Sequence, residues 1–255
     1  MNAAAIAALC RPGVAIEVVG ETGSTNADLL ARAADLPGPT LLVAEHQTAG
    51  RGRAGRSWLS AADGSLTFSL AWKFDGALQR LAGLPLAVGV ALAETLAALG
   101  VQVRLKWPND LLKDGDKLAG ILIETQAAPD GVTWAVIGIG LNLRMPDDLE
   151  AQIGRTVAAA PWLAQMDRNA LMAALTDGLA TALTTFEQAG FGAFSARWNR
   201  LHAYQGDTVT IIDRGALLHE GVAAGVDDSG RLLLDTAAGR IAVLAGDVSL
   251  RVKGD

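Results

Sequence analysis

A glycine- and arginine-rich segment at positions 50–56 carries the densest group of ligand-binding side chains in the sequence. It reads Gly-Arg-Gly-Arg-Ala-Gly-Arg. Its glycines leave backbone N–H groups accessible, and its guanidinium groups suit carboxylates and phosphates. The segment matches the dinucleotide pattern G-x-G-x-x-G, but that pattern opens a helix, whereas here an Asp63-Gly64 turn leads into another predicted strand. We predict an anion-binding loop, with a solvated surface loop as the alternative that composition leaves open.

Further polar and aromatic side chains stand at the ends of predicted elements, where a ligand can reach them. Ser24, Thr25 and Asn26 precede a predicted helix, so they can cap that helix, bind a ligand, or do both. Each of the other candidates also has a structural interpretation, as a loop amide, a turn residue, a solvated lysine or a core tryptophan. These candidates are Gln47, Trp58, Asn109, Asp110, Lys117, Gly120 and Asn142.

Hydrophobic periodicity places these candidates on a mixture of strands and helices. Strands are expected at 14–19, 40–45, 65–72, 101–107, 117–125 and 134–143. Helical patterns cover 27–34, 85–99 and 168–200. The stretch 81–101 is long enough to span a membrane, but Pro85, Gly89 and Glu94 within it favour a buried helix of a soluble protein.

The pattern changes after position 203, where helical periodicity gives way to short strands. These strands are expected at 208–213, 217–226, 231–235 and 240–243. About 50 residues of closely spaced short strands predict a small β-barrel attached to an α+β main domain. We therefore expect two domains, at 1–203 and 204–255.

Composition excludes several classes of function. Of the 255 residues, 51% are hydrophobic and 19% are charged, which indicates a folded chain with a substantial core. The net charge of -6 argues against a protein that mainly grips nucleic acid. The single cysteine, Cys10, argues against an internal disulfide. The first residues have no signal-peptide pattern. The three histidines lack the spacing of zinc ligands. A cytoplasmic protein is expected.

Five motifs, in order, resemble those of the biotin protein ligase family. They read Ser-Thr-Asn at 24–26, Ala-Glu-His-Gln-Thr-Ala-Gly-Arg-Gly-Arg-Ala-Gly-Arg-Ser-Trp at 44–58, Lys-Trp-Pro-Asn-Asp at 106–110, Lys-Leu-Ala-Gly-Ile-Leu at 117–122 and Gly-Ile-Gly-Leu-Asn at 138–142. The resemblance covers roughly 14–251 and departs at His46, where members often have tyrosine. It implies a central mixed sheet with flanking helices, as in class II aminoacyl-tRNA synthetases, and an SH3-like C-terminal barrel. It also implies the stand-alone form without an N-terminal DNA-binding domain.

The resemblance implies a two-step reaction and a role for each candidate. Biotin and ATP, with Mg²⁺, form biotinyl-5′-AMP and pyrophosphate, and biotin then passes to a lysine of a biotin carboxyl carrier protein. Lys117 and Arg53 are the implied catalytic residues. The implied biotin-binding residues are Ser24, Thr25, Asn26, Gln47, Gly50, Arg51, Gly52, Arg53, Lys117 and Gly120. The implied nucleotide-binding residues are Arg53, Arg56, Trp58, Asn109, Lys117, Asn142 and Arg251, with Asp110 beside the Mg²⁺ of ATP.

Two other functions stay open at this point. A lipoate or octanoate protein ligase shares the fold and the acyl-transfer chemistry, although not this density of Gly-Arg-Gly-Arg and Trp-Pro-Asn-Asp motifs. A non-catalytic biotin sensor would keep the pocket without turnover. The expected partners are biotin, ATP and a carrier protein, with neither nucleic acid nor membrane, and an exposed edge strand would also permit a homodimer.

Overall fold

A seven-stranded sheet forms the centre of the computed structural model, which describes residues 1–128, 131–213, 215–246 and 248–252. Its strand order is β1-β2-β3-β7-β6-β5-β4. The strands are β1 (Ala15–Thr22), β2 (Thr40–Gln47), β3 (Ser65–Asp75), β4 (Arg104–Lys106), β5 (Asp110–Lys113), β6 (Asp116–Ala127) and β7 (Val132–Asn142). Because β1 pairs with β2 in parallel while the other pairs are antiparallel, the sheet is mixed, as expected.

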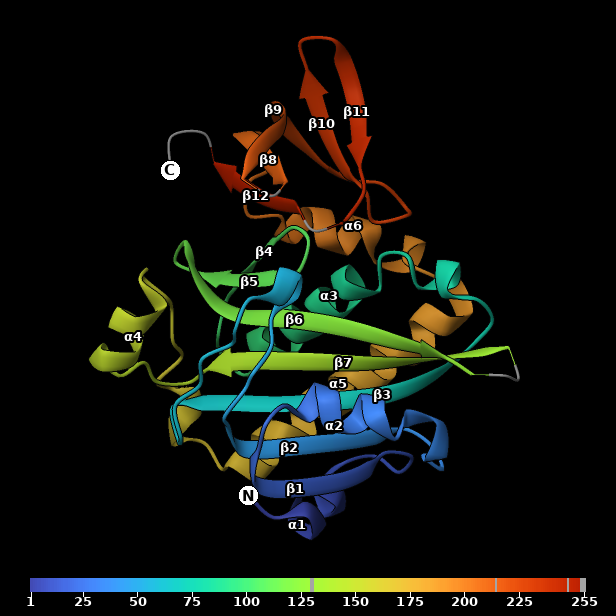
Figure 1. Cartoon of the computed structure of the whole chain (residues 1–255), viewed down its shortest axis with the longest axis vertical. Helices are drawn as coiled ribbons and strands as arrows, with labels where there is room; N and C mark the ends of the chain where they lie inside the picture. The colour runs from blue at the N-terminus through green and yellow to red at the C-terminus, as the bar shows by residue number, and fades with distance from the viewer. Residues whose placement is uncertain (129–130, 214, 247, 253–255) are drawn as a thin grey trace.

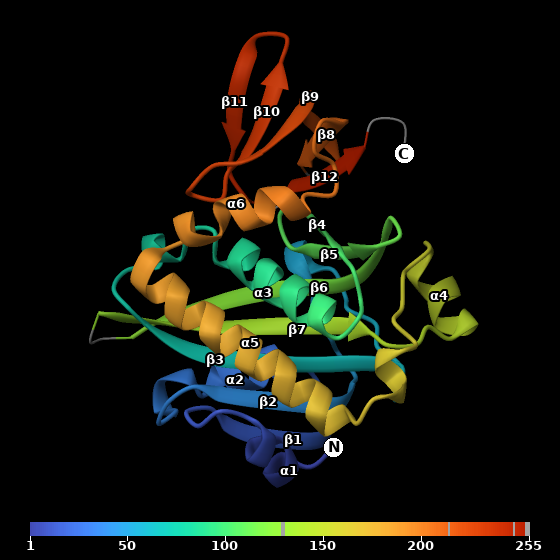
Figure 2. The ribbon, with the colours of Figure 1, turned by 180° about the vertical axis from the view of Figure 1, so that it is seen from behind.

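Helices cover the two faces of this sheet unequally. The helices are α1 (Ala3–Leu9), α2 (Thr25–Ala31), α3 (Leu84–Ala98), α4 (Asp147–Ile153), α5 (Arg168–Ala189) and α6 (Gly192–Leu201). The short α2 lies on the face that Figure 1 presents, whereas α3 and α5 cross the opposite face in Figure 2. The long helices therefore enclose the core on one side and leave much of the α2 side open for a site.

The apolar helix predicted at 85–99 is confirmed as α3, and it belongs to the core. The helical stretch Leu78–Ala98 is long and apolar enough to cross a membrane, but 61% of its most apolar window is buried in the protein. Gly89 faces the sheet, and a Cβ atom there would make an ordinary van der Waals contact, 3.4 Å, with Leu105 Cδ2. Ten of the fifteen residues of α3 are buried, which explains why its apolar residues surround the helix instead of forming one stripe.

A second, five-stranded antiparallel sheet follows α6, with the order β11-β10-β9-β8-β12. Its strands are β8 (Thr208–Asp213), β9 (Ala216–Val226), β10 (Leu232–Thr236), β11 (Gly239–Val243) and β12 (Val248–Val252). It stands beyond α6 and β4 at one end of the molecule (Figure 1). Trp107 Nε1 donates a 3.2 Å hydrogen bond to Gly230 O and so ties this sheet to the main one. The arrangement is consistent with an SH3-like domain, and the strand pairings described do not close it into a barrel.

Candidate active site

A cavity of about 590 Å³ opens on the α2 side of the main sheet. Its floor consists of aligned rows across β3, β7 and β6. In one row Ser69 pairs with Gly138 and Gly138 with Leu122, and in the next Thr67 pairs with Gly140 and Gly140 with Gly120. The glycines on β7 and β6 carry no side chain, so they leave space above the sheet for groups from other elements.

The first row accommodates Asn26 of α2. A Cβ atom at Gly138 would lie only 2.3 Å from Asn26 Oδ1, so any larger residue at that position would displace the amide. Asn26 is 3% exposed, and three hydrogen bonds hold it there. Ser69 Oγ donates to Asn26 Oδ1 at 2.6 Å, and Asn26 Nδ2 donates to Leu122 O at 3.3 Å and Glu124 Oε2 at 2.9 Å. Asn26 is thus fixed against the floor.

The second row accommodates Trp58 and Lys117. A Cβ atom at Gly140 would lie 2.2 Å from Trp58 Cε2, and one at Gly120 would lie 2.9 Å from Lys117 Nζ. Lys117 Nζ is 5.6 Å from the centre of the Trp58 ring, close enough for a cation–π contact. Trp58 Nε1 is buried and has no hydrogen-bond partner among the described residues, which leaves a donor inside the cavity.

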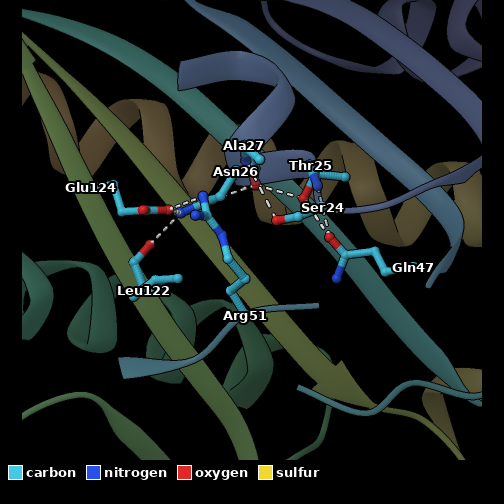
Figure 3. A network of polar contacts seen from close by, with 9 residues as sticks. Ser24, Thr25, Asn26, Ala27, Gln47, Arg51, Leu122 and Glu124 are labelled. Atoms are coloured by element: carbon cyan, nitrogen blue, oxygen red, sulfur yellow. Dashed lines mark hydrogen bonds and ion pairs between the residues drawn. The ribbon is translucent and has the colours of Figure 1, made fainter. Parts of the chain in front are cut away.

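The start of α2 supplies a polar wall to the cavity (Figure 3). Ser24 is the N-cap, with Oγ accepting from Ala27 N, so the helix begins two residues earlier than the predicted 27–34. Thr25 donates from N and from Oγ1 to Gln47 Oε1, at 2.8 and 3.0 Å. The Thr25 and Ser69 hydroxyls are 2.7 Å apart. These contacts orient Gln47 so that its Nε2 donor makes no hydrogen bond to any residue described here.

The Gly/Arg segment forms a small hairpin over the cavity. Arg51 and Ser57 form an antiparallel bridge, Trp58 N donates to Gly50 O at 2.9 Å, and a 3-10 turn (Arg53–Gly55) closes the tip. Gly50 is required at the base because a Cβ atom there would lie 2.4 Å from Trp58 O. The loop is therefore shaped by its glycines, and its guanidinium groups extend from a defined backbone.

Two of the loop arginines reach other elements. Arg53 donates to Asn109 Oδ1 at 2.8 Å and also to Gly246 O beyond β11, so it joins the loop to both sheets. Asn109 in turn donates to Ile121 O at 2.8 Å. Arg51 donates to Glu124 Oε2 at 3.0 Å. These contacts bring positive charge to one wall of the cavity.

Lys117 and Asp110 form an ion pair beside the cavity, with Nζ 2.5 Å from Oδ1. Asp110 Oδ1 is buried, and the Lys117 ammonium balances its charge. A buried carboxylate oxygen suits Mg²⁺, which is usually held by one or two carboxylates together with substrate phosphates. The described residues contain no group of three His, Cys, Asp or Glu side chains able to hold a metal alone.

Further cations surround the ion pair. Burial lowers the pKa of Lys106, the charges of Arg155, Lys117 and Arg251 lower it further, and Asp110 opposes the change. Arg155 lines the cavity from the segment after α4, whose backbone docks on Lys117 and Asn142. Ala158 N donates to Lys117 O at 3.0 Å, and Asn142 Nδ2 donates to Ala158 O at 3.1 Å. This end of the cavity is suited to a polyanion.

The structure brings most of the predicted site residues together. The cavity lining includes Ser24, Thr25, Asn26, Gln47, Arg51, Gly52, Arg53, Arg56, Trp58, Asn109, Lys117, Gly120 and Asn142. Gly50, Asp110 and Arg251 lie outside that lining: Gly50 shapes the loop, Asp110 pairs with Lys117, and Arg251 is on β12.

Sequence reasoning missed Ser69, Glu124 and Arg155. Ser69 alternates with Ser65 and Thr67 along an apolar strand, and all three are buried, so the polar alternation was a usable signal. Glu124 follows Gly120 at an even spacing on β6, which places both on one face of the sheet. Arg155 is in an irregular segment and had no comparable signal.

The fold and the cavity define a class of protein in which a polar, partly cationic site lies beside a Gly/Arg loop on the open face of a mixed sheet. A family model, the Biotin/lipoate A/B protein ligase family, matches residues 16–142, and a second, the Biotin protein ligase C terminal domain, matches residues 205–251. A curated relative from Mycobacterium tuberculosis, a biotin–[acetyl-CoA-carboxylase] ligase, is 38% identical over 91% of this chain and 88% of its own length. The chain belongs to the biotin protein ligases of this family.

Other relatives agree with this assignment. The bifunctional ligase/repressor BirA of Escherichia coli is 35% identical over 94% of this chain and 75% of its own length. A solved biotin protein ligase from Aquifex aeolicus, in complex with biotin and ATP, has 28% identity, a TM-score of 0.76 and coverage of 93% of this chain and 99% of that one. The expected fold, a central mixed sheet with flanking helices, is confirmed.

Proposed function

We propose that this chain is an ATP-dependent biotin protein ligase that makes biotinyl-5′-AMP and transfers the biotinyl group to a lysine of a carrier protein. The observation that carries the proposal is one cavity, lined by the fixed amides and hydroxyls of α2 and also by Lys117, Asn109 and arginines. A neutral polar wall suits the ureido ring of biotin, and the cationic end suits its carboxylate and the phosphates of ATP.

In the first step a carboxylate oxygen of biotin attacks the α-phosphorus of ATP. A new P–O bond forms, the bond to the β-phosphate oxygen breaks, and pyrophosphate leaves with the electron pair. Negative charge crowds at phosphorus, and fixed cations stabilise it. We assign Lys117 and Arg53 to this role because both line the cavity and both are held, Lys117 by Asp110 and Arg53 by Asn109.

In the second step an acceptor lysine amine attacks the carbonyl carbon of the mixed anhydride. A C–N bond forms, the bond to the AMP oxygen breaks, AMP leaves with the electron pair, and the amine proton passes to solvent. Water must be kept from the anhydride until the amine arrives, and we assign this to the Gly/Arg loop and the segment that carries Arg155.

The remaining residue roles are also proposals. Ser24, Thr25, Asn26 and Gln47 hold or position the ureido end of biotin, and Gln47 Nε2 is the donor left available. Trp58, Arg56, Asn142 and Arg251 serve the nucleotide. Asp110 would hold the Mg²⁺ that accompanies ATP together with the phosphates, and the ion would neutralise phosphate charge. We place the domain boundary at 203/204, and we propose a cytoplasmic protein whose acceptor is a biotin carboxyl carrier protein.

The test is pyrophosphate release from MgATP with biotin or lipoate as the only acid. Biotin-dependent release that Lys117→Ala abolishes supports the proposal. Release with lipoate alone would identify a lipoate ligase, and tight biotin binding without release would identify a sensor. The Biotin protein ligase C terminal domain match favours biotin over lipoate.

A further inference from the structure

We propose that Glu124 is a positioning residue that ties the biotin end of the cavity to the Gly/Arg loop. A single carboxylate oxygen, Glu124 Oε2, accepts from Asn26 Nδ2 at 2.9 Å and from Arg51 at 3.0 Å (Figure 3). Asn26 belongs to α2 and Arg51 to the loop, while Glu124 is on the sheet between them. The inference rests on the proposed function for its ligand and on these contacts for its mechanism.

The Asn26 side of this tether is rigid. The Asn26 amide contacts Ser69, Leu122 and Glu124 at once and lies against Gly138, so it cannot rotate without losing hydrogen bonds. Because Oδ1 and Nδ2 of Asn26 both hydrogen-bond to protein groups, Asn26 acts by orienting the side chains around it. Because the Ser69 hydroxyl donates to Asn26, it accepts from Thr25 Oγ1, and the backbone N of Thr25 orients Gln47.

The Arg51 side is the more exposed one. The Arg51–Ser57 bridge and the Trp58 N to Gly50 O bond are internal to the hairpin, so the contacts that Arg51 and Arg53 make with other elements hold the loop in its place. The Arg51 side chain is 44% exposed and that of Glu124 is 26% exposed. Arginines at 51, 53 and 56 repel one another, and Glu124 offsets that charge from the sheet.

Glu124→Gln separates the two contacts. The glutamine oxygen still accepts from Asn26 Nδ2, but the attraction for Arg51 falls because the charge is gone. A partly exposed ion pair contributes up to about 1 kcal/mol, which corresponds to about a fivefold change in an equilibrium. We expect the KM for biotin to rise about threefold to fivefold while kcat changes less.

A ligand-free measurement tests the tether independently of catalysis. Trypsin cleaves after arginine, and cleavage at Arg51, Arg53 and Arg56 follows the population of the displaced loop. Glu124→Gln should accelerate this cleavage about threefold to fivefold without shifting the urea midpoint. Added salt should accelerate cleavage of the wild type toward the variant rate, since it screens the same ion pair.

Two comparisons make the result specific. Glu94→Gln breaks a comparable ion pair with Arg197, between α3 and α6, and should leave loop cleavage and the KM for biotin unchanged. In an Arg51→Gln background, adding Glu124→Gln should have no further effect on cleavage at Arg53 and Arg56.

Unchanged cleavage and unchanged KM in Glu124→Gln would overturn the inference. A lower KM would overturn it too, because it would mean that Glu124 competes with the ligand for Arg51. If the variant changes loop cleavage as expected while the wild type gives no biotin-dependent pyrophosphate, the tether stands and the proposed function fails.

Discussion

Replacing Gly138 by alanine tests whether the glycine on β7 exists to accommodate Asn26. The added Cβ would lie 2.3 Å from Asn26 Oδ1 and 2.8 Å from Cγ, well inside contact distance. A flexible side chain would move aside, but Asn26 is buried and pinned by Ser69, Leu122 and Glu124. Losing two of these hydrogen bonds costs about 2 kcal/mol, similar to the cost of inserting one methyl group into a packed site.

Urea unfolding measures this cost, and a double-mutant cycle identifies its cause. We expect Gly138→Ala to lower the free energy of unfolding by about 2 kcal/mol and to weaken biotin binding in calorimetry. Asn26→Ala removes the same hydrogen bonds and also empties the space above Gly138. Adding Gly138→Ala to that variant should therefore lower the free energy of unfolding by less than about 0.5 kcal/mol. Gly20→Ala is the control, because a Cβ atom at Gly20 meets nothing within 4 Å.

Additive effects of Gly138→Ala and Asn26→Ala would refute the reasoning, since the clash with Asn26 would then not be the source of the cost. A Gly138→Ala variant as stable as the wild type, with normal biotin affinity, would refute it as well.

Three further predictions concern the nucleotide end of the cavity and His202, which directly follows α6. Arg155→Gln should raise the KM for MgATP about threefold to tenfold and leave the biotin Kd unchanged, measured by pyrophosphate release and calorimetry; an unchanged KM would exclude a phosphate contact. Gly140→Ala should displace Trp58 and raise the KM for MgATP about fivefold or more, and equal effects on both substrates would contradict that assignment. Burial lowers the pKa of His202, so the unfolded state binds a proton more readily than the folded state, and stability should fall as the pH drops below about 6.5. In His202→Gln the urea midpoint should decline less steeply with falling pH. Parallel pH profiles of the variant and the wild type would contradict this.

The strands of the site were predictable because their sequence patterns are local. The predicted strand at 208–213 coincides with β8, and the apolar runs at 40–45 and 134–143 lie within a residue or two of β2 and β7. The strand expected at 101–107 is only β4, Arg104–Lys106, because Val101 and Val103 are buried by core packing without strand pairing. Hydrophobic alternation reports burial on one face, and here burial occurred without a ladder partner.

Helix boundaries depended on single residues. The helices expected over 168–200 are α5 and α6, and the point of division, which was not predicted, is Gly190, whose φ of +65 ends α5 before the chain turns into α6. The short helices α1 and α4 were not predicted, and seven residues give too few turns for a periodic signal.

The candidate site was predicted through motif resemblance, whereas its geometry depends on strand order. Ser69, Gly138 and Leu122 are far apart in the chain and become neighbours only because β3, β7 and β6 pair in that order and register. Glu124 joins the site for the same reason. Asn26 hydrogen-bonds to Ser69 of β3 and to Glu124 of β6, and these two strands lie on opposite sides of β7. Long-range register of this kind is not encoded in any short window of sequence.

The most direct test of the central claim is the intact mass of a biotin carboxyl carrier domain after incubation with this protein, biotin and MgATP. The proposed ligase adds one biotinyl group to one lysine, the addition requires all three components, and Lys117→Ala prevents it. A carrier whose mass stays unchanged while the protein binds biotin, or one modified only when lipoate is supplied, would contradict the assignment.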